Sequence, residues 1–241
     1  MSASTALDAQ GLFARAGLSS MQRDEMFALL RRHFDGVTRE QFDHDLTAKD
    51  WVIEIRPDDM LLGFTTLRVN ASEFEGEPIT AIYSGDTIVT PEAWGTPALA
   101  RSWIAGVNRV RASFPGRRCF WLLLTSGFRT YRFLPVFWRE FFPCHCASTP
   151  ARAQRLLNQL AGEGYGEHFD AQTGIVRFPQ PQRLRGRLAG VPEGRDRNPH
   201  VAFFLSRNSG HHEGNELVCL TEICDANLTP AGRRVAGVSY P

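Results

Sequence analysis

The sequence predicts an α/β fold of the α+β kind, in which a mixed central sheet contains an antiparallel meander and is flanked by helices. Two observations carry this prediction. Three strand-like runs follow one another between residues 51 and 89 with only short polar turns between them, which is typical of a meander. A β-α-β-α run over residues 79–142 then adds a helix, a buried strand and an aromatic helix.

Length and composition indicate one large globular domain. The chain has 241 residues, of which 43% are hydrophobic and 22% are charged, and its formal net charge is +1. Because no global field would attract nucleic acid or an anionic membrane, we expect neither nucleic-acid binding nor stable membrane insertion. No signal peptide or membrane-spanning run is evident, so we expect a cytoplasmic protein. Five cysteines form no disulfide framework, and Lys49 is the only lysine, which excludes a Walker-type phosphate loop.

The N-terminal part predicts a tail followed by two helices. Residues 1–18 are rich in Ala, Ser and Gly, which is typical of a flexible tail or a weakly docked helix. Ser19 or Ser20 can cap a first helix that ends at Gly36, and Thr38 begins a capping-box pattern for a second helix. The strands of the meander are expected at residues 51–56, 61–70 and 79–89.

The segment after the third strand reads TPEAWGTP and leads into a helix. Thr96 is a good N-cap and Pro97 a good first-turn residue, and apolar residues then recur at helical spacing until Pro115 and Gly116. Residues 119–125 are nearly all apolar, as in a strand buried on both faces. Residues 128–142 predict one aromatic helix that Pro143 ends.

The C-terminal part predicts a helix, a loop-rich insertion and a closing hairpin. The helix is expected at 151–162 and the insertion at 170–199, where Arg, Pro, Gly and Gln are frequent. Two strand-like runs, 201–207 and 216–223, are joined by NSGHHEGN and predict the hairpin. We therefore expect a tail over 1–18, a core over 19–150, and residues 151–241 completing the same domain.

This order of elements resembles the GCN5-related N-acetyltransferase (GNAT) superfamily, of which the chain looks like a divergent member. The resemblance covers residues 19–143 element by element and the C-terminal hairpin more loosely. It implies a splayed pair of strands that admits the pantetheine arm of an acyl donor, and a loop after the third strand that binds its phosphates. It therefore implies an N-acyltransferase that uses acyl-CoA or an acyl carrier protein. The donor-binding residues that it implies are Ile88, Val89, Thr90, Gly95, Thr96 and Ala98.

The phosphate loop departs from the family pattern at two positions. Trp94 stands where the family usually has a basic or amide residue, and Pro97 stands at the second glycine and has no N–H. Two explanations are open. The donor is a carrier protein, whose phosphopantetheine has a single phosphate, as in the acyl-homoserine-lactone synthase and N-acyl amino acid synthase branch. Alternatively, the site has decayed and the chain is an inactive binding or regulatory protein.

The resemblance also suggests the groups that move protons. Asp86 on the third strand is the candidate base, and the alternative is that it begins a bulge or caps a turn, as Gly-Asp pairs often do. The usual tyrosine acid is absent from its place, and Tyr131 is the candidate replacement unless it only packs. Arg129 and Arg132 flank it and are candidates for binding a phosphate or a carboxylate-bearing acceptor; surface arginines are the alternative.

The remaining reactive groups lie near the C-terminal hairpin. His200 and His211 are candidates for substrate binding in a lid over the acceptor, and an exposed loop tip is the alternative. With His212, Glu213 and Glu216 they match no zinc signature, so we expect no metal. The three residues from Cys144 to Cys146 read as the packed end of a helix, since Cys-x-Cys alone is a weak metal signal.

Overall fold

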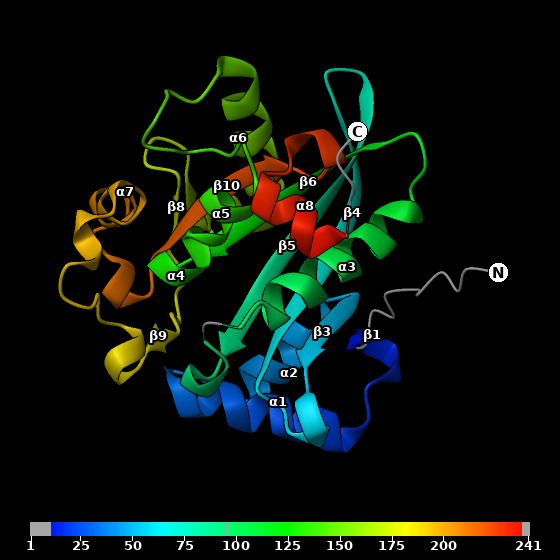
Figure 1. The fold of residues 1–241 in the computed structure, drawn as a ribbon, viewed down its shortest axis with the longest axis vertical. Coiled ribbons are helices and arrows are strands. Elements are labelled where there is room, and N and C mark those ends of the chain that lie inside the picture. The colour runs from blue at the N-terminus through cyan, green and yellow to red at the C-terminus, as the bar shows by residue number, and fades with distance from the viewer. Residues whose placement is uncertain (1–10, 95, 238–241) are drawn as a thin grey trace.

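The computed structural model describes residues 11–94 and 96–237. Its main element is an eight-stranded mixed sheet with the strand order β1-β3-β4-β5-β6-β10-β8-β7 (Figure 1). A small second sheet pairs β2, Phe34–Asp35, with β9, Arg183–Leu184. The predicted mixed sheet with flanking helices is confirmed.

The two N-terminal helices begin at the capping residues that the sequence indicates. Helix α1, Ser20–His33, starts after Ser19, whose side chain accepts a hydrogen bond from the backbone N–H of Gln22 while the Gln22 side chain accepts from Ser19. Helix α2, Arg39–Thr47, starts after Thr38, whose hydroxyl accepts a hydrogen bond from the backbone N–H of Gln41. Local capping chemistry is therefore enough to place both starts.

The meander follows as expected. Strands β3, Trp51–Ile55, β4, Gly63–Phe74, and β5, Glu77–Val89, pair antiparallel in chain order. The tail prediction was wrong in part, because Leu12–Ala14 forms strand β1 on the free edge of β3. Residues 1–10 of the predicted tail lie outside the described residues.

Helix α3, Ala98–Ala112, connects β5 to the parallel strand β6, Arg118–Thr125. The predicted N-cap was wrong by one residue. Pro97 occupies the N-cap position, and the Thr96 hydroxyl donates instead to the carbonyl of Ala93 at 2.9 Å. The helix therefore starts without a side-chain cap.

The single aromatic helix predicted for residues 128–142 was also wrong. The segment forms two short helices, α4, Phe128–Tyr131, and α5, Phe133–Phe137. Pro135 has no N–H to continue a helical ladder, and Trp138 then takes an extended conformation and bridges to Leu228. Tertiary pairing with the C-terminal segment replaces the last turns of the helix.

The C-terminal part contains one strand of the predicted hairpin. Helix α6, Ala151–Tyr165, is confirmed, and it is followed by the short strands β7, Phe169–Asp170, and β8, Ile175–Val176. Residues 199–207 form helix α7, Pro199–Arg207, so the strand predicted there was wrong. Strand β10, Glu216–Glu222, pairs with β6 and β8, and helix α8, Pro230–Ala236, completes the fold.

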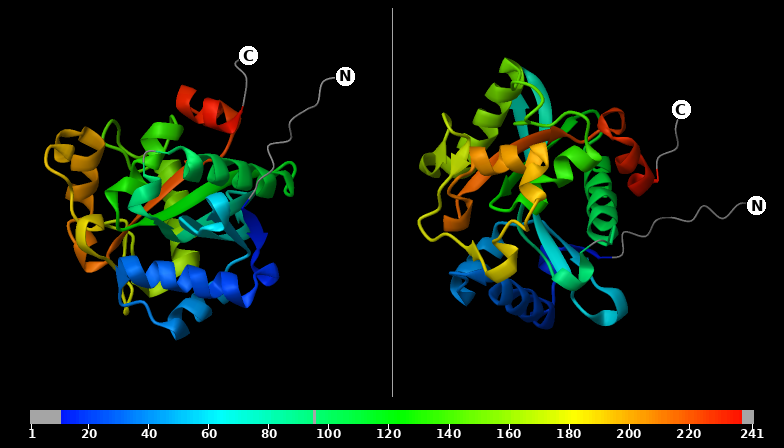
Figure 2. Two further views of the ribbon diagram at one scale, coloured as in Figure 1. Left: turned by 60° about the horizontal axis from the view of Figure 1, so that its bottom comes forward. Right: turned by 60° about the vertical axis from the view of Figure 1, so that its left-hand side comes forward.

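Helices cover both faces of the sheet. On one face α8 packs against α3 and α5 over a core that includes Trp103, Trp121 and Trp138. On the other face α6 covers one part of the sheet and α1 with α2 covers another, each over its own apolar cluster. Figure 2 shows α8 and the pair of α1 and α2 on opposite sides of the sheet. Two layers of helices thus enclose the strands that form the site.

Candidate active site

The candidate site lies where β5 and β6 separate. These parallel strands are paired from Ile79 opposite Arg118 to Ser84 opposite Leu123. Beyond this point β5 continues to Val89 and β6 to Thr125 without pairing to each other. At the fork the indole N–H of Trp121 donates to the hydroxyl of Ser84 at 2.7 Å, and both residues are buried. The splayed pair of strands that the resemblance implied is therefore present.

A cleft of about 300 Å³ occupies the gap between the two strands. This volume is at the lower end of the range of about 300–1,000 Å³ typical of small-molecule sites. Its walls come from the end of β5, the start of α3, the first turns after β6 and the segment around β9. Most of them are apolar or aromatic, and they include Ile88, Val89, Ala93, Trp94, Leu99, Trp103, Trp121, Phe133, Phe137, Leu184 and Leu188.

The loop before α3 uses most of its N–H groups internally. The N–H groups of Ala93, Trp94 and Thr96 donate to carbonyls of the same loop at 3.0, 3.1 and 3.4 Å. Pro97 has no N–H. The first backbone donor bonded at the helix start is that of Arg101, to the carbonyl of Pro97, so the orphan donors of the first turn are those of residues 98–100. One anionic group can be held there, at the start of a 15-residue helix.

Trp94 and Arg129 meet at this end of the cleft. The Trp94 indole N–H donates to the carbonyl of Val89 at 3.1 Å, and the Arg129 guanidinium lies 4.4 Å from the centre of the Trp94 ring. Arg129 also donates to the carbonyl of Leu188 at 3.0 Å. Of the described residues that line the cleft, Arg129 alone is charged, and burial lowers its pKa from the ordinary value. The cleft therefore has one cation and apolar walls.

Asp86 lies at a β-bulge, on the face of the sheet that carries α2 and α6. The pairing of β4 with β5 shifts between Phe64 and Thr66, and Asp86 has a φ of 47°, in the left-handed region that Asp tolerates better than most residues. Its carboxylate accepts from the Thr66 hydroxyl at 3.1 Å and pairs with the Lys49 ammonium at 3.2 Å. The neighbouring Gly85 faces the same ammonium, since a Cβ there would lie 3.3 Å from Lys49 Nζ. The bulge interpretation of Asp86 is thus correct for the backbone.

Two further carboxyl groups gather around Lys49. The pKa of Glu216, at the start of β10, is raised to about 7, chiefly by burial and then by the charge of Asp86, while Lys49 lowers it. Burial and then Asp86 also raise the pKa of Asp45 on α2, while Gln41 and Lys49 lower it. We call Asp45, Lys49, Asp86 and Glu216 the acidic cluster. Its net charge with every carboxyl ionised is negative, so it suits a cationic ligand.

Tyr165, at the end of α6, lies beside the acidic cluster. Burial, and then the charge of Glu216, raise the pKa of its phenol above the ordinary value. Its ring lies 6.4 Å from that of Tyr83, whose hydroxyl donates to the carbonyl of Leu160 at 3.1 Å. Tyr165 is therefore a neutral hydroxyl next to the carboxyl groups.

Only some of the predicted donor-binding residues line the cleft. Ile88, Val89 and Thr96 line the cleft, as does Arg129. Thr90 is buried and its N–H donates to the carbonyl of Leu62, while Ala98 offers its backbone at the first turn of α3. Gly95 lies outside the described residues.

The structure does not bring the other predicted residues to the cleft. Tyr131 is fully buried, packs against Phe141 and Phe204, and donates its hydroxyl to the carbonyl of Pro143 at 3.0 Å. This arrangement agrees with the packing alternative, and burial raises its pKa. Arg132 lies near His200 instead of the cleft.

His200 and His211 belong to another part of the molecule. The His200 ring lies 4.3 Å from that of His145, and its Nδ1 is buried without a partner among the described residues. His211 stacks near Phe204. Burial lowers the pKa of both histidines. No group of three or more His, Cys, Asp or Glu in the described ranges is arranged to hold a metal ion.

Sequence reasoning missed that Glu216 and Lys49 lie beside Asp86. Glu216 was considered only as a metal ligand, and Lys49 only as the single lysine. A signal for Glu216 exists, because a carboxylate directly before the apolar run of residues 217–220 is an unusual residue to bury. Its proximity to Asp86, however, depends on the pairing of β10 with β6.

No family model and no curated protein matches the sequence. Among solved structures, a conserved protein of unknown function from Enterococcus faecalis aligns at 14% identity over 54% of this chain and 32% of its own, with a TM-score of 0.41. A GNAT-family N-acetyltransferase from Escherichia coli in complex with CoA aligns at 18% identity over 51% of this chain and 66% of its own, with a TM-score of 0.37. An aminoglycoside 6′-N-acetyltransferase complexed with coenzyme A aligns at 10% identity over 88% and 97%, with a TM-score of 0.39.

This chain thus spans about a third of the first of these structures and about two thirds of the second. At such identities and TM-scores, the fold assignment rests on this chain's own topology: a meander, a crossover helix and a splayed parallel pair. None of the helices in the described part of the chain has the length and apolar character that crossing a membrane requires.

Proposed function

We propose that this chain, whose fold is that of a divergent GNAT protein, is an N-acyltransferase that moves an acyl group from a pantetheine thioester to a small amine. One observation carries the proposal: β5 and β6 stop pairing after Ser84 and Leu123, and an apolar cleft fills the gap beside the start of α3. A narrow slot with apolar walls suits the long, thin pantetheine arm and its acyl group. Buried backbone N–H and C=O groups need hydrogen-bond partners. The unpaired strand ends at the centre of this sheet are therefore consistent with a ligand that binds between them.

The donor binds with its arm in the cleft and its phosphate at the start of α3. The N–H groups of residues 98–100 and the Arg129 guanidinium supply the donors for the phosphate. The unpaired end of β5 supplies backbone groups for the pantetheine amides, although the carbonyl of Val89 is already bonded to Trp94. Apolar walls exclude water from the thioester.

The acceptor binds at the acidic cluster on the other face of the fork. Asp86 is held in an ion pair with Lys49, whereas the pKa of Glu216 is about 7. A general base is most effective when its pKa is close to the working pH, so we assign this role to Glu216. The amine nitrogen attacks the thioester carbon, its proton passes to Glu216, and the C–S bond breaks. Glu216 passes this proton on to the leaving thiolate, and Tyr165, whose phenol stays protonated, supports the transfer as a hydrogen-bond donor.

The donor has one phosphate group in this proposal, as on an acyl carrier protein. The loop of residues 90–97 supports this choice because it uses three of its N–H groups internally and Pro97 has none, which leaves little to hold the pyrophosphate of CoA. Acyl-CoA is the other source of the same thioester. That the chain is related to the acyl-homoserine-lactone synthase branch stays a prediction.

Thiol release tests the proposal. Acyl-CoA and acyl-loaded carrier protein are each incubated with the protein and a panel of small amines, and the free thiol is followed. We expect release that depends on the amine and is faster with the carrier protein. Faster turnover of acyl-CoA would overturn the choice of donor, and no release with any donor from folded protein would overturn the enzyme proposal.

A matched pair of arginines locates donor binding. Arg129 lines the cleft, whereas Arg132, one turn later, does not. Arg129→Gln should raise KM for the donor about tenfold because a charge-assisted hydrogen bond to phosphate is lost. Arg132→Gln should leave KM unchanged, and equal effects of the two variants would argue against this cleft.

The second candidate function is a binding module without turnover. The internally bonded loop favours it, because the same shortage of phosphate donors is expected of a decayed site. It predicts that CoA or pantetheine raises the melting temperature without thiol release.

A further inference from the structure

A second cavity, of about 530 Å³, lies away from the cleft on the face of the sheet covered by α6. It is bordered by the start of β6, the segment after α5, the start of α6 and the end of β10. Its apolar wall consists of Phe74, Phe120, Phe142, Pro150, Ala153, Leu156, Leu220 and Ala226. Three arginines, Arg118, Arg139 and Arg152, also line it.

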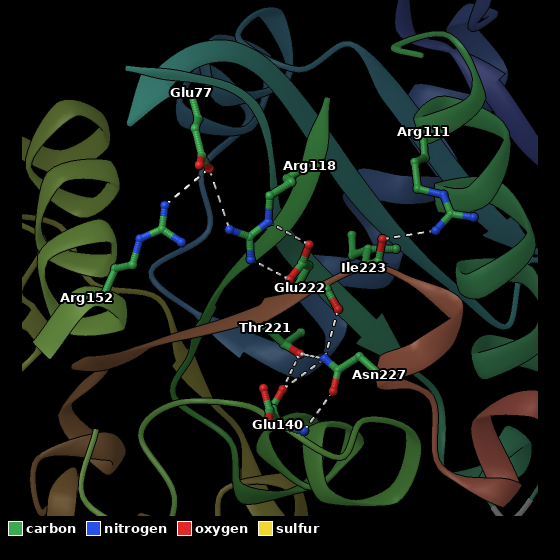
Figure 3. A network of polar contacts seen from close by, with 9 residues as sticks. All are labelled: Glu77, Arg111, Arg118, Glu140, Arg152, Thr221, Glu222, Ile223 and Asn227. Carbon is green, nitrogen blue, oxygen red and sulfur yellow. Dashed lines mark hydrogen bonds and ion pairs between the residues drawn. The ribbon is translucent and has the colours of Figure 1, made fainter. Parts of the chain in front are cut away.

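A rigid frame holds one rim of this cavity (Figure 3). The side-chain amide of Asn227, which is 8% exposed, donates to the carbonyls of Glu140 and Glu222 at 3.0 and 2.9 Å and to the Thr221 hydroxyl at 3.0 Å. Its amide oxygen accepts from the backbone N–H of Glu140 at 2.8 Å. The backbone N–H of Arg139 donates to the Asn227 carbonyl at 2.8 Å. These hydrogen bonds fix the backbone at residues 139–140, and they thereby fix the position of the Arg139 Cα from which its side chain extends.

Two of the three arginines already have carboxylate partners. Arg118 binds Glu222 through two nitrogens, at 2.9 and 2.7 Å. Arg152 binds Glu75 and Glu77 at 2.9 and 3.1 Å, and Figure 3 shows Glu77 between Arg152 and Arg118. Both guanidinium groups also lie over aromatic rings. Arg118 is 5.0 Å from the ring centre of Phe120, and Arg152 is 5.6 Å from that of Phe74.

Arg139 differs from these two. It is exposed, and no carboxylate of the described residues forms an ion pair with its side chain. Its neighbour Glu140 also lines the cavity and is likewise exposed. An unpaired guanidinium at the rim of an apolar cavity matches a carboxylate in geometry and charge, because its planar fork can donate two parallel hydrogen bonds.

We propose that this second cavity binds an amphipathic monocarboxylate, a small molecule with one carboxylate and an aliphatic or aromatic body. The carboxylate binds Arg139, and the body packs on Phe120, Phe142 and Leu220. The site is separate from the cleft. Phe120 and Trp121 are successive residues of β6 and so point to opposite faces, Phe120 into this cavity and Trp121 into the cleft. The proposal does not depend on acyl transfer.

Calorimetric titration with decanoate and with decanol tests the site on the full chain. Decanoate should bind, and decanol should bind at least tenfold more weakly, because it lacks the charge that Arg139 recognises. Arg139→Gln should weaken decanoate binding about tenfold, and Glu140→Gln should not weaken it, since that change removes a like charge. Arg155→Gln is the control, because Arg155 on α6 pairs with Glu75 and does not line the cavity.

Two outcomes would overturn the proposal. One is equal decanoate affinity in the wild-type protein and Arg139→Gln. The other is loss of binding in Arg129→Gln with retention in Arg139→Gln, which would place the fatty chain in the cleft. Circular dichroism of each variant shows that a loss of binding is not a loss of fold.

Discussion

At the scale of single residues, Glu216 is the group on which the proposed chemistry depends. Its pKa rises from the ordinary 4.5 to about 7, chiefly because it is buried. A base with this pKa is partly ionised at neutral pH and still basic enough to take a proton. Asp86 was the base expected from the sequence, but its carboxylate is held by Lys49 and Thr66.

Glu216→Gln should lower kcat by about 100-fold or more, since a positioned general base contributes about 10²–10⁴-fold. In the wild-type protein kcat/KM should rise as the pH passes through about 7, where Glu216 loses its proton. That rise should be absent in the residual activity of the variant. Glu213→Gln is the control, because Glu213 is exposed in the neighbouring turn. Unchanged activity in Glu216→Gln would exclude Glu216 as the base.

The same substitution has a pH-dependent effect on stability. Between pH 4.5 and 7 the folded protein holds a proton on Glu216 that the unfolded chain has lost, so the free energy of unfolding falls as the pH rises through this window. Glutamine does not titrate. At pH 8 Glu216→Gln should therefore be more stable than the wild type by about 1–2 kcal/mol, less than the full shift implies because the side chain is half-buried and keeps some contact with solvent. Urea unfolding at pH 4 and pH 8 measures the difference.

Lys49 sets the charge balance of the acidic cluster. Its ammonium lowers the pKa of Glu216 and pairs with Asp86. Lys49→Met should therefore move the rise of kcat/KM to higher pH, whereas Lys49→Arg keeps the charge and should leave it in place. A pH–rate profile that is the same for all three proteins would show that Lys49 does not act on the base.

At the scale of elements, one buried hydrogen bond lies at the fork between β5 and β6. The Trp121 indole donates to Ser84 at 2.7 Å at the last paired position, where Ser84 is 3% exposed. Its ring lies 4.1 Å from that of Trp103 and 5.1 Å from that of Trp138. The aromatic cluster thus replaces strand pairing as the support of the separated ends.

Trp121→Phe should lower the free energy of unfolding by about 2 kcal/mol, because it leaves a buried hydroxyl without its donor and removes part of the ring packing. Trp94→Phe is the matched control. Its indole also bonds a strand residue, Val89, but the ring is 36% exposed, so the change should cost less than about 0.5 kcal/mol. Urea unfolding compares the two, and equal losses would contradict the role given to the fork.

Helix α7 begins at ordinary local signals in the sequence. Asn198 accepts from the N–H groups of His200 and Val201, and Pro199 occupies the first helical position. These are ordinary signals of a helix start. Apolar residues such as Phe203 and Phe204 suggested a strand instead, because a short apolar run has no clear period.

At the scale of the whole molecule, the two cavities should act independently. They open on opposite faces of the sheet and share no lining residue. Pantetheine and decanoate, each at 100 times its dissociation constant, should each stabilise the fold by about 2.7 kcal/mol, and together by about the sum. Thermal unfolding measures this, and a combined effect no larger than one ligand's would mean that both compete for one site.

The sequence by itself determined the elements that local chemistry specifies: the caps of α1 and α2, the meander, the crossover helix α3, the buried strand β6 and α6. These features depend on periodicity and turn chemistry over a few residues. The family resemblance implied donor contacts at Ile88, Val89 and Thr96, and all three line the cleft.

Only the tertiary structure decided which distant residues share the site. The edge strand Leu12–Ala14, the break after Phe137 and the meeting of Glu216 with Asp86 each arise from pairing between segments far apart in the chain. A side chain's pKa depends on the charges and the burial around it, and neither is a property of its neighbours in sequence. The proposed base is therefore Glu216 and not Asp86, and only the pairing of β10 with β6 shows that these two residues are neighbours.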